Sequence, residues 1–209
     1  MVFDNPLARL LEHPAIWRGR SSVQPATIAS GFVALDAALP GGGWPLVGLV
    51  EILTPQFGIG ELRLLVPVLA QLTQRPPPRW VTWVAPPFEP YAPALAARGL
   101  VLERQLVVHT DTVLWAMEQA LGSGACDVAL GWTQRAPARS LRRLQLAAER
   151  GRTLGVLFRA LRTAREASPA MLRLAVEPLC MSQGEGVRIT LLKSRGGARG
   201  SFDIHWTPR

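Results

Sequence analysis

The stretch ILTPQFGIGELRLL, at positions 52–65, holds the residues whose types and spacing first suggest chemistry. An apolar run leads into a turn with Gly58 and Gly60, and a second apolar run follows. Nucleotide-binding proteins place a phosphate loop at such a junction, with a lysine for the phosphates and a Ser or Thr for Mg²⁺. Glu61 and Leu62 follow the last glycine instead. The sequence therefore predicts a structural turn that binds no nucleotide, metal or other cofactor.

Glu61 itself favours this interpretation. Its carboxylate would repel a triphosphate placed over the turn. A carboxylate in the first turn of a helix is stabilising by roughly 0.3–1 kcal/mol without any ligand. We therefore expect Glu61 to satisfy the helix terminus that a phosphate would otherwise occupy.

A basic segment between Arg135 and Arg165 is the second chemical feature. It holds nine arginines and one acid, so it carries +8, which equals the formal net charge of the whole chain. Localised charge indicates an anionic partner better than a diffuse excess does, although a solvated helix face is the ordinary alternative. DNA and an acidic protein both fit as partners. The candidate residues for DNA or partner binding are Arg135, Arg139, Arg142, Arg143, Arg150, Arg162 and Arg165.

Other chemistry is not indicated by the residue types. The three histidines are far apart and give no metal-ligand spacing, and two cysteines give no disulfide framework. The N-terminus lacks the apolar core of a signal peptide, and no apolar run reaches the ~20 residues that a spanning helix needs. A cytoplasmic protein is expected.

Alternating apolar runs must position these residues. Strands are predicted at 46–53, 80–85, 104–109, 126–132 and 153–159, with helices between them that include 60–74 and 137–151. Three further β runs follow at 170–179, 186–194 and 201–206. Because the first strands are apolar without alternation, both of their faces are expected to be buried. The predicted fold class is α/β, a doubly wound, mostly parallel sheet with helices on both faces and a β-rich C-terminal end.

The block at positions 27–65, TIASGFVALDAALPGGGWPLVGLVEILTPQFGIGELRLL, resembles the opening of the RecA ATPase core, and the resemblance extends over nearly the whole chain. The shared features are a Ser-Gly pair, a Leu-Asp-x-Ala-Leu run, a Gly-rich loop and a Val-Glu-Ile strand. The residues that match are Ser30, Gly31, Leu35, Asp36, Ala38, Leu39, Gly42, Gly43, Val50, Glu51 and Ile52. The resemblance implies a RecA-like core domain over residues 31–209, preceded by an N-terminal helix and extended arm over residues 1–30.

The ATPase residues of the RecA family have no counterpart in this sequence. Gly60 and Glu61, or Glu61 and Leu62 with a shift of one residue, stand at the places of the loop Lys and Thr. Pro86 and Pro87 stand where the catalytic Glu is expected. Gly131 and Trp132 stand where the Mg²⁺-orienting Asp is expected. The resemblance thus implies a protein that is not an enzyme and has no catalytic residues. Its degenerate loop would comprise Thr54, Gly58, Gly60 and Glu61.

A RecA-like core without ATPase residues, together with PGGGWP and GIGELRLL, resembles the ImuA family. That resemblance implies an adaptor in SOS-induced translesion DNA synthesis and mutagenesis, with ImuB and RecA as partners. Non-specific contact with single-stranded DNA and a homo-oligomer stay open. By analogy with RecA, the candidate RecA contacts are Leu7, Leu10, Leu11, Lys193 and Arg195. The related SulA family, whose members inhibit cell division by binding FtsZ, is the alternative.

Overall fold

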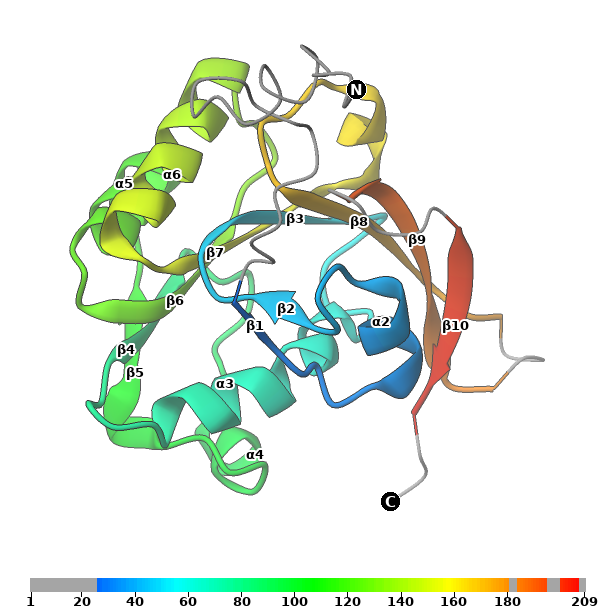
Figure 1. The fold of residues 1–209 in the computed structure, drawn as a ribbon, viewed down its shortest axis with the longest axis horizontal. Helices are drawn as coiled ribbons and strands as arrows, with labels where there is room; N and C mark the ends of the chain where they lie inside the picture. The colour runs from blue at the N-terminus through cyan, green and yellow to red at the C-terminus, as the bar shows by residue number, and fades with distance from the viewer. Residues whose placement is uncertain (1–25, 181–183, 195–199, 207–209) are drawn as a thin grey trace, which may run out of the picture.

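An eight-stranded sheet runs through the molecule, with the strand order β10-β9-β8-β3-β7-β6-β4-β5 (Figure 1). We describe residues 26–180, 184–194 and 200–206 of a computed structural model. A separate antiparallel ribbon pairs β1 (Thr27–Ile28) with β2 (Trp44–Pro45). The predicted boundary between an arm at 1–30 and a core at 31–209 stays a prediction, because nearly all of the arm lies outside the described residues.

Six strands form the parallel part of the sheet. They are β3 (Gly48–Thr54), β4 (Trp80–Val84), β5 (Gln105–Val108), β6 (Cys126–Trp132), β7 (Leu154–Ala160) and β8 (Leu172–Pro178). Every residue of β3 and β7 is buried, since these central strands are covered on both faces. The apolar runs of the sequence correctly predicted these strands.

Two antiparallel strands extend the sheet beyond β8. They are β9 (Gly186–Ser194) and β10 (Ser201–His205). Strand β5 closes the opposite edge. The sheet is therefore mixed, with an antiparallel hairpin on one side of a parallel centre.

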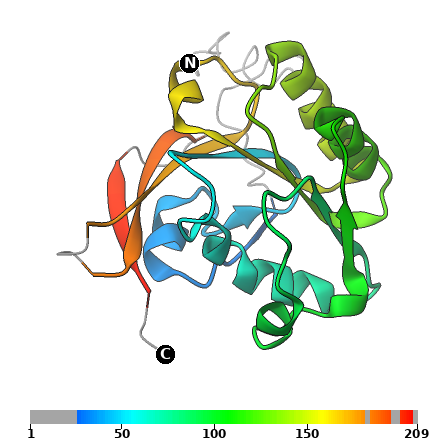
Figure 2. The ribbon, with the colours of Figure 1, turned by 180° about the vertical axis from the view of Figure 1, so that it is seen from behind.

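Helices pack against both faces of the sheet (Figures 1 and 2). One core cluster includes Leu35 of α2 (Val33–Ala38), Leu69 of α3 (Val66–Thr73) and Leu95 of α4 (Ala92–Ala96). The other cluster includes Met117 of α5 (Val113–Gly122) and Leu144 of α6 (Ala138–Gly151). Short 3₁₀ helices at η1 (Glu61–Leu64), η2 (Leu102–Arg104) and η3 (Leu161–Arg165) complete the described elements.

The prediction of a RecA-like doubly wound fold is wrong. The sheet is a mixed one, and within the described residues only α3, α5 and α6 reach eight residues. Proline is one physical reason. The helix predicted at 60–74 is broken into η1 and α3, because Pro67 has no N–H and fits only the first turn of a helix. Helix α4 also has a proline, Pro93, in its first turn and is short, and η3 is the one helical element described between β7 and β8.

A buried ion network ties three strands to η3. The Glu51 carboxylate on β3 receives Arg159 Nη1 at 2.7 Å and Arg173 Nε at 2.6 Å. Arg159 also reaches Glu166 at 2.8 Å, and Arg173 donates to the backbone oxygens of Thr163, Ala164 and Glu166. Arg159 is thus a core residue of the network, although it lies within the basic segment of the sequence.

In the part of the chain described here, no helix is long and apolar enough to cross a membrane. Within the same residues, no group of three or more His, Cys, Asp or Glu side chains is arranged to hold a metal ion.

Candidate functional site

The turn after β3 is built around Glu61. Its Oε1 accepts a hydrogen bond of 2.9 Å from the backbone N–H of Gly58, three residues earlier. Gly58 and Gly60 have positive φ angles of 89° and 104°, so glycine is required for this path of the backbone. The carboxylate therefore uses one of the backbone donors that a phosphate loop would offer to a ligand.

The Glu61 side chain is only 3% exposed, and its second oxygen, Oε2, is buried without a hydrogen-bond partner among the described residues. Thr54, at the carboxyl end of β3, likewise has a buried Oγ1 that no described residue pairs with. Buried polar atoms are nearly always paired in folded proteins, because an unpaired one loses its hydration. These two atoms make the turn a candidate for binding.

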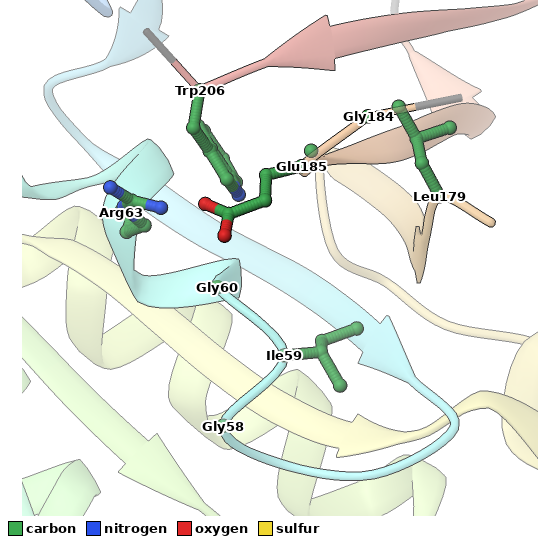
Figure 3. A pocket seen from close by; sticks show the side chains of 9 residues that line it. Gly58, Ile59, Gly60, Arg63, Leu179, Gly184, Glu185 and Trp206 are labelled. Carbon is green, nitrogen blue, oxygen red and sulfur yellow. The ribbon is translucent and has the colours of Figure 1, made fainter. Parts of the chain in front are cut away.

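Two hollows flank this turn, and Gly58 and Gly60 line both of them. The first hollow, of about 470 Å³, lies between the turn and the β8–β10 end of the sheet. Figure 3 shows Arg63, Glu185 and Trp206 around it. The Arg63 guanidinium stacks on the Trp206 ring at 4.8 Å, so this cation already has an aromatic partner within the chain.

The second hollow, of about 320 Å³, is here named the aromatic pocket. Glu61 and the buried Trp83 line it, and the loop between β4 and α4 forms its rim. Phe88 and Tyr91 of that loop are 67% and 71% exposed. The lining residues are Gly58, Gly60, Glu61, Leu62, Val66, Trp83, Pro87, Phe88, Glu89, Pro90, Tyr91, Ala94, Leu95 and Arg98. Large exposed aromatic side chains beside a hollow are typical of protein-binding surfaces.

The arginines proposed from the sequence fall on two elements and on the loop before α6. Arg139, Arg142, Arg143 and Arg150 are exposed on α6, whose opposite side buries Leu141 and Leu144. Arg135 precedes α6, while Arg162 and Arg165 lie on η3 and are also exposed. This set of seven is here named the arginine face.

Some side chains of the arginine face already have partners. Arg143 forms an ion pair with Glu118 of α5 at 2.6 Å, and Arg162 donates to Gln134. Arg150 packs against Gly122, where an added Cβ would lie 2.3 Å from its Nη2. Arg139 and Arg142 are therefore the members of the face best placed to meet another molecule.

Of the residues proposed to contact RecA, Leu7, Leu10, Leu11 and Arg195 lie outside the described residues. Lys193, on β9, donates from Nζ to the backbone oxygen of Ser168 at 2.7 Å. This hydrogen bond therefore connects β9 to the segment that precedes β8.

Asp127 lies at the start of β6, far along the strand from the turn. Arg79 pairs with it at 3.2 Å. Burial raises the pKa of Asp127 more than Arg79 and Arg75 lower it. We assign this pair to the packing of the strand, since neither residue lines the hollows beside Glu61.

The sequence did not single out Phe88 and Tyr91. Their signal is the run APPFEPYAP, in which proline limits regular structure and leaves two aromatic residues in a loop. Such aromatic residues in a loop have no sheet or helix face to pack against.

Comparison with known proteins finds similarity to the SulA family. A family model described as "Cell division inhibitor SulA" matches residues 52–155, from the end of β3 to the start of β7. SulA of Photorhabdus laumondii is 34% identical over 111 residues, which cover 52% of this chain and 62% of that protein. SulA of Edwardsiella piscicida is 35% identical over 98 residues, or 46% of this chain and 57% of that protein. The chain thus spans about three-fifths of the length of these relatives.

A solved structure of SulA from Pseudomonas aeruginosa was also found. It is 26% identical, covers 53% of this chain and 97% of its own, and superposes with a TM-score of 0.45.

These matches overturn the resemblance to ImuA. The predicted adaptor role in translesion synthesis, with ImuB, RecA and single-stranded DNA as partners, is wrong, and the SulA alternative is the better reading. The derivation of the turn from an ATPase loop is likewise unsupported. The RecA-like block at 27–65 overlaps the matched segment at residues 52–65, while its matching residues from Ser30 to Glu51 precede that segment.

Several of the residues that resemble RecA have a structural role in this fold. Asp36 accepts a 2.7 Å hydrogen bond from the backbone of Ser30. An added Cβ on Gly43 would lie 2.2 Å from the oxygen of Ile28. Packing needs of this kind can produce a shared pattern without a shared function.

Proposed function

We propose that this chain inhibits bacterial cell division by binding FtsZ, and that it does so without catalysing a reaction. The match of residues 52–155 to the SulA family model carries the proposal. That segment includes β4, β5 and β6, the helices between them and the turn with Glu61. Its relatives are described as cell division inhibitors, and FtsZ as the target is our inference from the SulA resemblance.

The aromatic pocket supports this proposal because it lies within the matched segment. Phe88 and Tyr91 are large, exposed and close in sequence, on a loop that a proline-rich run restrains. Aromatic side chains of this kind are enriched among the residues that dominate binding energy at protein interfaces. We place the main FtsZ contact at this pocket.

The arginine face is proposed as a second contact for an acidic partner surface. Charge on the rim of an interface mainly speeds association and makes it sensitive to salt. Changing Arg139 and Arg142 to Glu should therefore slow association with FtsZ by roughly tenfold at low salt and have a smaller effect at high salt. Surface plasmon resonance at two salt concentrations measures this.

Arg75→Glu is the charge control for the arginine face. Arg75 is exposed just after α3 and lines neither of the two hollows. An association rate that falls equally in the Arg75 variant, or that does not change in the α6 variant, would remove this face from the proposal.

A cellular experiment tests the proposed function. Expression of the chain in a bacterium that carries its matching FtsZ should produce elongated cells without FtsZ rings. Cell length and ring counts by fluorescence microscopy provide the readout. Cells that divide normally at a level of soluble protein equal to that of a known SulA would contradict the proposal.

A further inference from the structure

The Glu61 carboxylate has one oxygen in use and one without a partner. Oε1 accepts from Gly58, while Oε2 is buried and unpaired in the described part of the chain. The side chain is more than nine-tenths buried and belongs to the lining of the aromatic pocket. A buried, unpaired anionic oxygen indicates a missing cationic or hydrogen-donating group.

The walls of the aromatic pocket suit an organic cation. Phe88 lies against the turn that holds Glu61, since an added Cβ on Gly58 would lie 3.2 Å from the Phe88 ring. Tyr91 and Trp83 supply two more aromatic rings to the lining. Aromatic faces attract ammonium and guanidinium groups, and a carboxylate pairs with them through charge-assisted hydrogen bonds.

The charges around the aromatic pocket agree with this. Glu61 and Glu89 are its acids, and Arg98 is its one base among the described lining residues. Glu89 is exposed and lies 3.5 Å from His109, while no ion pair joins Arg98 to Glu61 in the described part of the chain. The net charge of the lining is therefore negative, although the chain as a whole carries +8.

We infer that the aromatic pocket receives a basic side chain, arginine or lysine, from the bound protein, and that Glu61 Oε2 pairs with it. The inference rests on the proposed function for the identity of that protein, FtsZ. The inference that the bound group is a basic side chain rests on the residues of the pocket alone. The arginine side chain is the better fit, because its planar guanidinium can stack on Phe88 or Tyr91 while it donates to the carboxylate.

Titration with N-acetyl-arginine amide tests the pocket without FtsZ. Its uncharged isostere, N-acetyl-citrulline amide, is the matched ligand control. We expect saturable shifts of the Gly58 and Gly60 amide resonances with the arginine compound, with an affinity in the millimolar range, as is usual for so small a ligand. The citrulline compound should bind at least about tenfold more weakly, because it cannot form the ion pair.

Three variants locate the site. Glu61→Gln keeps the acceptor for Gly58 and should weaken arginine binding by about tenfold or more. Phe88→Ala, at a position that is 67% exposed, should weaken it by about threefold or more. Trp115→Ala, a change at a 61% exposed aromatic residue on α5, should leave it unchanged.

The inference is overturned if the arginine compound gives no saturable shift, or if Glu61→Gln and Phe88→Ala both bind it as the wild type does. The same variants should then be tested for FtsZ binding. If the Glu61→Gln variant binds FtsZ as tightly as the wild type does, the inference is overturned and the proposed function is unaffected. Absence of FtsZ binding by a wild type that binds the arginine compound would overturn the proposed function instead.

Discussion

Replacing Glu51 with alanine should lower the free energy of unfolding by about 3–5 kcal/mol, because it leaves two buried arginines without their shared carboxylate. Arg159 and Arg173 are 1% and 5% exposed, and both donate to Glu51. A loss of that size is a large fraction of the 5–15 kcal/mol that is typical of a folded domain. Urea denaturation followed by circular dichroism measures it.

Arg188→Ala is the matched control for the Glu51 variant. Arg188 also pairs with a carboxylate, Asp203, on neighbouring strands, but that pair is exposed to solvent. Its loss should leave the urea midpoint nearly unchanged. If Glu51→Ala lost only about 1 kcal/mol or less, the value of a surface pair, the buried network would not be what holds β3, β7 and β8 to η3.

Replacing Phe88 and Tyr91 together with alanine should weaken FtsZ binding by roughly a thousandfold. Each is expected to contribute about 2 kcal/mol, as central aromatic residues of an interface do, and the two contributions together give that factor. Both side chains are largely exposed, so the urea midpoint should not fall. Isothermal titration calorimetry against FtsZ measures the affinity.

Trp115→Ala is the control for the aromatic pair. Trp115 is exposed on α5, a helix that packs on the α6 side of the sheet and does not line the pocket. Its loss should change the affinity little. A double variant at Phe88 and Tyr91 that binds within about threefold of the wild type would move the FtsZ contact to another surface.

The sequence predicted the elements better than their arrangement. The buried strands β3, β6 and β7 follow from unbroken apolar runs, and α6 follows from leucines and arginines on opposite sides of one helix. The helix predicted at 60–74 failed at Pro67, where the backbone changes from η1 to α3. Apolar runs and the spacing of residues along a helix thus predicted the strands and helices that depend on nearby residues.

Pairings over long sequence distances could not be predicted in the same way. Arg159 counts toward the charge of the basic segment, but its side chain is buried and pairs with a carboxylate 108 residues away. The sequence drew attention to Glu61 at the start of a helical segment, but the pocket beside it depends on Phe88 and Tyr91 from the next connection. The net charge of a sequence segment is therefore larger than the charge that it shows on the surface, when some of its arginines are buried and paired with acids from elsewhere in the chain.

The proposal that this chain acts on FtsZ is tested most directly by a pelleting assay with purified proteins. GTP-dependent FtsZ polymers are collected by centrifugation at increasing concentrations of the chain, with the Phe88 and Tyr91 double alanine variant in parallel. We expect the pelleted FtsZ to fall as the wild type approaches the FtsZ concentration, and the variant to have no effect at the same concentrations. An unchanged amount of pelleted FtsZ at a molar excess of folded wild-type chain would contradict the proposal.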